Sequence, residues 1–201
     1  MSDSGSGSVS CRWLECACAG EQQPFTFSLN NRTFLVRKMK AADYPAVRAL
    51  LPLVSRCQQQ LQEPQLSEVL RLSTYIPFCC FAAADTPDAT AAGAAGSAAS
   101  NGTNGCASKG LIEGPLCGFC EVYIQPHLGR AADGRLERVV VSPEYRGQGI
   151  GTALCRVVLQ FAKEQLGIGR IDLTVEKENA RHIYTKLGFE PVRTETLRLQ
   201  N

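Results

Sequence analysis

The sequence lacks the strong charge excess and the long apolar run that mark several large classes of protein. Twenty-one basic and nineteen acidic residues leave a formal net charge of +2, which is too small for the basic surface of a nucleic-acid-binding protein. No apolar stretch approaches the roughly 20 residues of a membrane-spanning helix, and the N-terminus lacks the basic and apolar regions of a secretion signal. We therefore expect a cytoplasmic protein that binds neither nucleic acid nor membrane.

The ten cysteines lack the spacing of a metal site and the context of a disulfide scaffold. Structural zinc sites usually combine two pairs of ligands, and disulfide scaffolds are usually short secreted chains. Cys117 and Cys120 fall in an apolar segment that reads as a strand, so their side chains are expected on opposite faces. We predict free thiols in the core and no metal ion.

By composition, the chain consists of one part that can form a core and two segments that have few large apolar residues. A chain of 201 residues with 44% hydrophobic content can bury one good core. Residues 1–23 are expected to form a flexible leader, and the Ala-, Gly- and Ser-rich residues 85–114 a disordered insert between strands. We place a single domain at residues 33–201.

Within this domain, periodicity and turn residues predict alternating strands and helices. Asp43, followed by Tyr44 and Pro45, is the expected N-cap of the first helix, and residues 125–134 are expected to connect two strands as a hairpin. Strands are predicted at 33–39, 77–83, 117–124, 136–141 and 170–175, and helices at 41–53, at 66–72 and from 152 onward.

The most informative segment is a glycine-spaced loop between a β-branched strand and an amphipathic helix. Gly147, Gly149 and Gly151 allow the backbone to turn without a Cβ clash, so that successive N–H groups can face one anion. The following helix adds unpaired amides and a favourable dipole, and Arg146 adds a cation. The loop predicts a pyrophosphate site, although a tight turn with glycines needed only for packing is the alternative for an isolated cluster. The loop lacks both the dinucleotide fingerprint and the lysine of a triphosphate-binding loop.

Segments 136–141, 146–151 and 183–190 together resemble the acyl-CoA-binding core of the GNAT superfamily of N-acetyltransferases. The resemblance implies an α/β (α+β) fold, in which a mixed central β-sheet is splayed at the acetyl-CoA site and carries helices on both faces. The loop amides would hold the CoA pyrophosphate, and pantetheine would lie between strands 136–141 and 170–175. The cofactor-binding residues that this implies are Val139, Val140, Val141, Arg146, Gly147, Gln148, Gly149, Ile150, Gly151, Thr152, Asn179, Tyr184 and Lys186.

Acetyl transfer to an amine needs a base, a donor for the thioester oxyanion and a proton for the departing thiolate. Glu137 is the candidate base, with an ion-paired carboxylate beside Arg138 as the alternative. The backbone N–H of Val139 or Val140 is the candidate oxyanion donor. Tyr184 matches the tyrosine that, in the family, hydrogen-bonds or protonates the CoA sulfur, and a core tyrosine is the alternative.

Segments 124–130 and 136–141 are also similar to the compact glucosamine-6-phosphate N-acetyltransferases. Two positions depart from that subfamily, because Arg138 replaces its Asp and Ala180 stands where it has an Asn. His127, Arg130 and Arg138 are candidates for binding an anionic group of the acceptor, with a solvated hairpin as the alternative.

These patterns favour an acetyl-CoA-dependent N-acetyltransferase that acts on a small amine such as glucosamine 6-phosphate, by direct attack in a ternary complex. A protein or peptide N-acetyltransferase and a noncatalytic acyl-CoA-binding module remain alternatives. Small acetyltransferases of this type frequently form homodimers, which is a further expectation from the resemblance.

Overall fold

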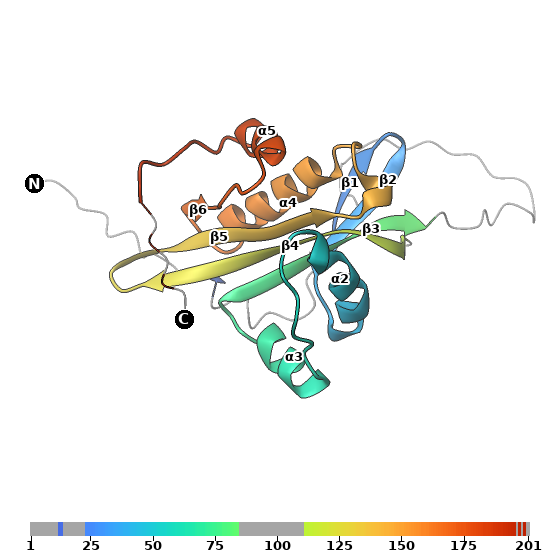
Figure 1. Cartoon of the computed structure of the whole chain (residues 1–201), viewed down its shortest axis with the longest axis horizontal. Helices are drawn as coiled ribbons and strands as arrows, with labels where there is room; N and C mark the ends of the chain where they lie inside the picture. Colours follow the sequence, from blue (N-terminus) through green and yellow to red (C-terminus); the bar gives the residue numbers. More distant parts are fainter. Residues whose placement is uncertain (1–11, 14–22, 85–110, 196, 198, 200–201) are drawn as a thin grey trace, which may run out of the picture.

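A six-stranded sheet runs through the protein with its strands in sequence order (Figure 1). The structure is a computed structural model that describes residues 12–13, 23–84, 111–195, 197 and 199. Neighbouring strands are antiparallel except β5 and β6, which are parallel. The strands are β1 (Phe25–Leu29), β2 (Arg32–Lys38), β3 (Tyr75–Ala84), β4 (Ile112–His127), β5 (Arg130–Val141) and β6 (Arg170–Asp172).

Four helices cover the two faces of this sheet. Figure 1 shows α2 and α3 on one face and α4 and α5 on the other, which confirms the expected mixed α/β fold. No described helix is long and apolar enough to cross a membrane. The helices are α2 (Tyr44–Leu50), α3 (Glu63–Leu70), α4 (Ile150–Glu164) and α5 (Glu178–Lys186), and 3-10 turns lie at Ala41–Asp43, Leu51–Leu53 and Pro143–Tyr145.

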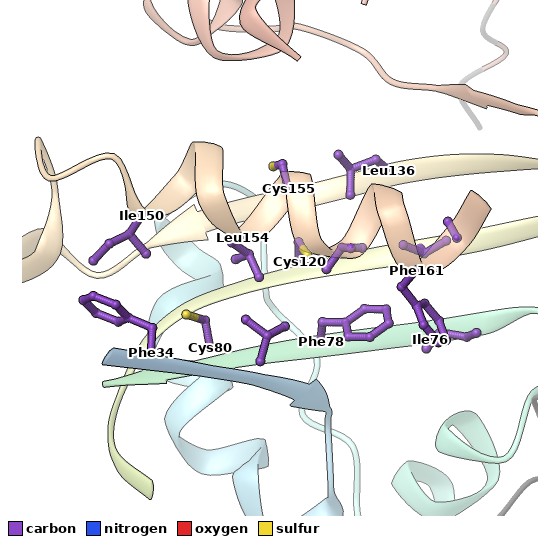
Figure 2. Packing of buried hydrophobic residues seen from close by; sticks show 14 of the residues in the cluster. Phe34, Ile76, Phe78, Cys80, Cys120, Leu136, Ile150, Leu154, Cys155 and Phe161 are labelled. Carbon is purple, nitrogen blue, oxygen red and sulfur yellow. The ribbon is translucent and has the colours of Figure 1, made fainter. Parts of the chain in front are cut away.

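The larger part of the core lies between α4 and the sheet (Figure 2). The helical spacing that predicted α4 places Leu154, Val158 and Phe161 against the strands, where all three are fully buried. The ring of Phe161 meets the ring of Phe78 on β3 edge to face at 5.4 Å. A smaller cluster around Val47 of α2 covers the opposite face. The site described below therefore rests on a rigid two-sided scaffold.

Several segments differ from the sequence-based expectations. Strand β1, which was not predicted, pairs with β2 through a tight turn at Asn30 and Asn31, which both have positive φ. Strand β4 already begins at Ile112, inside the expected insert, while residues 85–110 lie outside the described part of the chain. Within the expected leader, only Arg12 and Trp13 are described. Arg12 donates a hydrogen bond to the Glu164 carbonyl at 3.2 Å, and Trp13 packs against the core.

Asp43 occupies the expected N-cap position of α2. Its side chain makes no capping hydrogen bond to that helix. Instead it accepts the backbone N–H of Lys40 at 2.7 Å and pairs with Arg37 at 2.6 Å. The carboxylate is therefore turned back toward β2, because the guanidinium there offers a stronger partner than an exposed amide.

Cys117 and Cys120 do not point to opposite faces, because a β-bulge interrupts the strand between them. Cys80 lies opposite Gly118 and Phe81 lies opposite Leu116, which leaves Cys117 as the extra residue. The bulge turns Cys117 into the same core cluster as Cys120. The expected free core thiols are confirmed at the five buried cysteines of the described residues, namely Cys79, Cys80, Cys117, Cys120 and Cys155.

Candidate active site

The two parallel strands of the sheet separate after three residues and leave a gap. Residues 133–135 of β5 pair with 170–172 of β6, and β6 then ends at Asp172 while β5 continues to Val141. Among the described residues, no strand pairs with this edge of β5 beyond residue 135. Hydrogen-bonding groups of the backbone along 137–141 are thus available to a ligand. The separation of β5 and β6 is the splay of the sheet that the resemblance implied.

A cavity of about 610 Å³ lies at this opening. Its walls come from β4, from β5, from the segment that joins β6 to α5, and from the first and last turns of α5. Glu137, Val139 and Tyr184, which were chosen from sequence for the chemistry, all line it. Residues far apart in the chain are therefore brought to one cavity of a size suited to a small ligand.

A β-bulge in β5 shapes the wall of this cavity. Phe119 lies opposite Val140 and Glu121 lies opposite Glu137, so two residues of β5, Arg138 and Val139, face a single residue of β4. Arg138 has a φ of 48°, which is a left-handed conformation that a long side chain rarely adopts. The extra residue breaks the regular alternation and re-aims side chains and amides at the point where the strands part.

The carboxylate of Glu137 is oriented by Arg135, not by Arg138. Arg135 Nε donates to Glu137 Oε1, and Arg135 Nη2 donates to Thr174 Oγ1 at 2.6 Å. Thr174 belongs to the segment that follows β6, so Arg135 bridges the two walls of the gap. Glu137 therefore lies in the cavity as an anchored, ion-paired carboxylate.

Tyr184 is positioned by the way α5 ends. Gly188, with a φ of 88°, donates its N–H to the Thr185 carbonyl at 3.1 Å, and Phe189 donates to the Tyr184 carbonyl at 3.0 Å. These two bonds form a Schellman motif, and the Phe189 ring packs on Tyr184 at 6.0 Å. Burial raises the pKa of Tyr184 to about 12, and the nearby charge of Glu137 adds to the effect. The phenol is therefore protonated at neutral pH and can donate.

The glycine loop leads into a helix N-terminus with open amides. Gly147 and Gly149 have φ values of 75° and 85°, whereas Gly151 lies within the first turn of α4. The first intrahelical bond runs from the Ala153 N–H to the Gly149 carbonyl at 3.1 Å, and α4 has no side-chain cap. The amides of residues 150–152 are therefore without partners inside the helix. Arg146 Nε donates to the Val141 carbonyl at 3.1 Å, which ties the loop to the end of β5.

The remaining predicted cofactor residues surround this region. Val140 is buried toward α2, and Val141 packs on the α4 side. Gln148 donates to the Glu144 carbonyl at 3.4 Å. Ile150 is buried, Thr152 is half-buried, and Lys186 is exposed on α5. Asn179 lies in the first turn of α5, and its side chain falls outside the described part.

The predicted acceptor residues separate into two groups. Arg138 lines the cavity. His127 and Arg130 instead lie at the end of the β4–β5 hairpin, where they contact the buried carboxylate of Asp133 at 2.9 and 2.7 Å. Arg170 of β6 reaches the same carboxylate at 2.5 Å. Asp133 thus joins the two strands of the hairpin to Arg170 of β6.

Glu121 is a residue of this site that sequence reasoning missed. It is 2% exposed and lies on β4 opposite Glu137. Its oxygens accept hydrogen bonds from the phenols of Tyr75 and Tyr123 at 2.9 and 3.1 Å, and from Arg138 at 3.0 Å. A lone acidic residue inside the apolar run 116–124 was the available signal, because a strand rarely buries an acid without a specific partner.

Both phenols around Glu121 stay protonated at neutral pH. Burial raises the pKa of Tyr123 to about 12, and the charge of Glu121 adds to this. Burial likewise raises the pKa of Tyr75 well above its ordinary value. Glu121 therefore anchors Arg138 and, through it, the strained bulge of β5.

Within the described residues, no group of three or more His, Cys, Asp and Glu side chains is arranged to hold a metal ion.

Comparisons with known proteins agree with this geometry. Residues 71–189 match the family model described as the acetyltransferase (GNAT) family. The spermidine N(1)-acetyltransferase of Escherichia coli (strain K12) is 33% identical over 79 residues, which are 38% of this chain and 41% of that protein. The chain thus matches less than half of that relative's length.

Solved structures share the fold at low sequence identity. The glucosamine-6-phosphate N-acetyltransferase of Arabidopsis thaliana has a TM-score of 0.59 at 16% identity, covering 84% of this chain and 99% of that one. AAC(6')-Iy in complex with a CoA-containing bisubstrate analogue has a TM-score of 0.55 at 17% identity, covering 84% and 98%. The family model spans more than half of the chain. The protein belongs to the acetyltransferase (GNAT) family.

Proposed function

We propose that the protein transfers the acetyl group of acetyl-CoA to the primary amine of a small molecule, with glucosamine 6-phosphate as the best-matched acceptor. The observation that carries this proposal is the single cavity lined by Glu137, Val139 and Tyr184 at the open edge of β5. The glycine loop and the open amides of α4 lie at the end of the same strand, where the family binds the pyrophosphate of CoA.

Glu137, Val139 and Tyr184 of the cavity each have a role in this reaction. The neutral amine attacks the thioester carbon, so that a C–N bond forms and the C–S bond breaks. Glu137 takes the amine proton directly or through water, and the N–H of Val139 or Val140 hydrogen-bonds the developing oxyanion. Tyr184 gives a hydrogen bond or its proton to the departing thiolate, and its raised pKa keeps it in the donor form.

Two observations support a small amino-sugar phosphate as the acceptor. The β4–β5 hairpin resembles the compact enzymes of that specificity, and a solved enzyme of that name shares the fold. The two departures from that subfamily are now located, because Arg138 is engaged by Glu121 and Ala180 lines the cavity. A peptide acceptor and a noncatalytic acyl-CoA-binding module are the competing outcomes of the test. We also propose a cytoplasmic location and a homodimer.

The experiment measures thiol release from acetyl-CoA with glucosamine 6-phosphate, glucosamine, free amino acids, polyamines and an N-terminal peptide. In Glu137→Gln and Tyr184→Phe, we expect kcat to fall by about 100-fold or more, while calorimetry finds the acetyl-CoA Kd unchanged. Glu164→Gln, an exposed change at the end of α4, is the control. Tight acetyl-CoA binding without turnover on any acceptor would contradict the enzymatic proposal.

A further inference from the structure

A second cavity, of about 400 Å³, lies on the other side of the bulge, between the sheet and the α2–α3 region. Its charged lining residues are Arg48 of α2, Arg56 of the segment after it, Arg138 and Glu121. Three arginines and one glutamate thus line this cavity, so the lining carries an excess of positive charge.

Two of these three cations have no partner among the described residues. Glu121 is engaged by Arg138 and by two tyrosines, as described above. Within the described part of the chain, Arg48 and Arg56 form no hydrogen bond or ion pair, and Arg48 Nε is completely buried with no partner. A buried, unsatisfied donor on a charged group is costly, so an anion at this position would satisfy it.

The second cavity adjoins the first across Glu121 and Arg138. Glu121 and Arg138 line both cavities, and the segment after α2 runs along both, with Val54 and Ser55 at the first and Arg56 at the second. The N–H of Leu61 donates to the Tyr44 hydroxyl at 2.9 Å, which holds this segment against α2. Lys177, which follows β6, donates to the Leu53 carbonyl at 3.3 Å and joins it to the far wall of the first cavity.

We propose that Arg48 and Arg56 bind the anionic group, phosphate or carboxylate, of the acceptor and thereby direct its amine past Glu121 toward Glu137. This inference rests on the proposed function and adds a binding site for the acceptor to it. The planar fork of a guanidinium matches two oxygens of a phosphate or carboxylate. The same two cations repel a polyamine, so the site selects against acceptors that carry only positive charge.

The test compares acceptors that differ only in the anionic group. Glucosamine 6-phosphate against glucosamine tests a phosphate, and amino acids against their carboxamides test a carboxylate. We expect one anionic member to have a KM at least about 10-fold below that of its neutral counterpart. In Arg48→Met and Arg56→Met, that KM should rise about 10- to 100-fold while the KM for acetyl-CoA stays constant.

The control variant is Arg71→Met, because Arg71 is an exposed arginine at the C-cap of α3 that pairs with Glu68 outside both cavities. Circular dichroism and the urea midpoint establish that each variant is folded. Equal KM values for anionic and neutral acceptors, or unchanged KM values in both cavity variants, would overturn the proposal.

A binding measurement separates this inference from the proposed function. Calorimetric titration with glucosamine 6-phosphate, glutamate and inorganic phosphate reports anion binding even without turnover. Binding that is weakened in Arg48→Met and Arg56→Met but not in Arg71→Met supports the anion site alone. If folded wild-type protein binds none of these anions, the site is refuted whether or not another acceptor is acetylated.

Discussion

The two halves of β5 have opposite surroundings. Residues 133–135 are paired with β6, and the buried Asp133 at that end is held by His127, Arg130 and Arg170. Residues 137–141 of the same strand have no strand on that side within the described residues, contain a bulge and line a cavity. We refer to these halves as the closed end (133–135) and the open end (137–141).

The contrast shows how a sheet can expose backbone groups without becoming disordered. An unpaired strand edge is a liability in most proteins. Here ion pairs fix the closed end, and Glu121 fixes the bulge from the neighbouring strand. The open end can stay unpaired because the ion pairs of the closed end and Glu121 on β4 together fix its position. We therefore expect substitutions at the closed end to lower stability and substitutions at the open end to lower activity.

The largest effect is expected for Glu121→Ala. The change leaves Arg138 and two phenols without their acceptor, so the free energy of unfolding should fall by about 2–3 kcal/mol. Turnover should fall by about 10- to 100-fold because the bulge loses its anchor. Urea unfolding and steady-state kinetics measure these effects. Glu113→Ala is the control, since Glu113 also lies on β4 and pairs with an arginine at 2.6 Å but is 40% exposed. Full activity of Glu121→Ala would remove the proposed role of the bulge.

A smaller effect, on stability alone, is expected for Asp133→Asn at the closed end. Because the partner cations are partly exposed, the loss at pH 7 should be about 1–2 kcal/mol, with kcat unchanged. Arg130, with His127 and Arg170, holds the pKa of Asp133 well below its ordinary value. The stabilisation is therefore present above pH 3.8, the ordinary value, and is lost as the pH falls toward the folded-state pKa. Denaturation curves of both proteins should converge in acid. A loss of turnover at constant stability would contradict the division between the ends.

A matched pair of glycines tests the loop at the open end against a turn beyond the closed end. Gly147 and Gly129 have φ values of 75° and 87°, and an added Cβ would meet nothing within 4 Å at either position. Substitution by Ala should cost about 1 kcal/mol of stability in each case, from backbone strain. Only Gly147→Ala should weaken acetyl-CoA binding, by about 10-fold, because the loop amides shift. Equal Kd values in the two variants would show that the loop does not hold the ligand.

The smallest effect concerns Tyr184 in alkaline solution. Its pKa is raised from 10.0 to about 12, so the stabilisation is complete below pH 10 and is lost as the pH rises toward 12. Tyr184→Phe should therefore lose less stability than the wild type over this range. Tyr75 and Tyr123 have raised pKa values too, so the variant should retain part of the decline. Identical curves for both proteins would place Tyr184 in a more exposed position than the cavity wall.

Sequence patterns located most of the elements but few of the contacts. The helical period predicted α4 and its buried face, because this feature depends on neighbours in the chain. Patterns did not predict β1, although Phe25, Phe27 and Leu29 alternate with polar residues, because a five-residue run is a weak signal by itself. The sequence-based alternative for Glu137 was an ion pair with Arg138, whereas Arg138 binds Glu121 and Arg135 binds Glu137.

The sequence by itself determined the glycine loop, the amphipathic helix that follows it and the family. Local backbone conformation and periodicity depend on consecutive residues, so they can be recognised without the structure. Only the tertiary structure decided which carboxylate meets which cation, since a single bulge at Arg138 changes the direction of the residues around it. The same is true of the two cavities. The wall of the first cavity extends from Val54 to Tyr184 and that of the second from Met39 to Arg138. Arg48 and Arg56, which have no partner among the described residues, line a cavity only because these distant segments pack together.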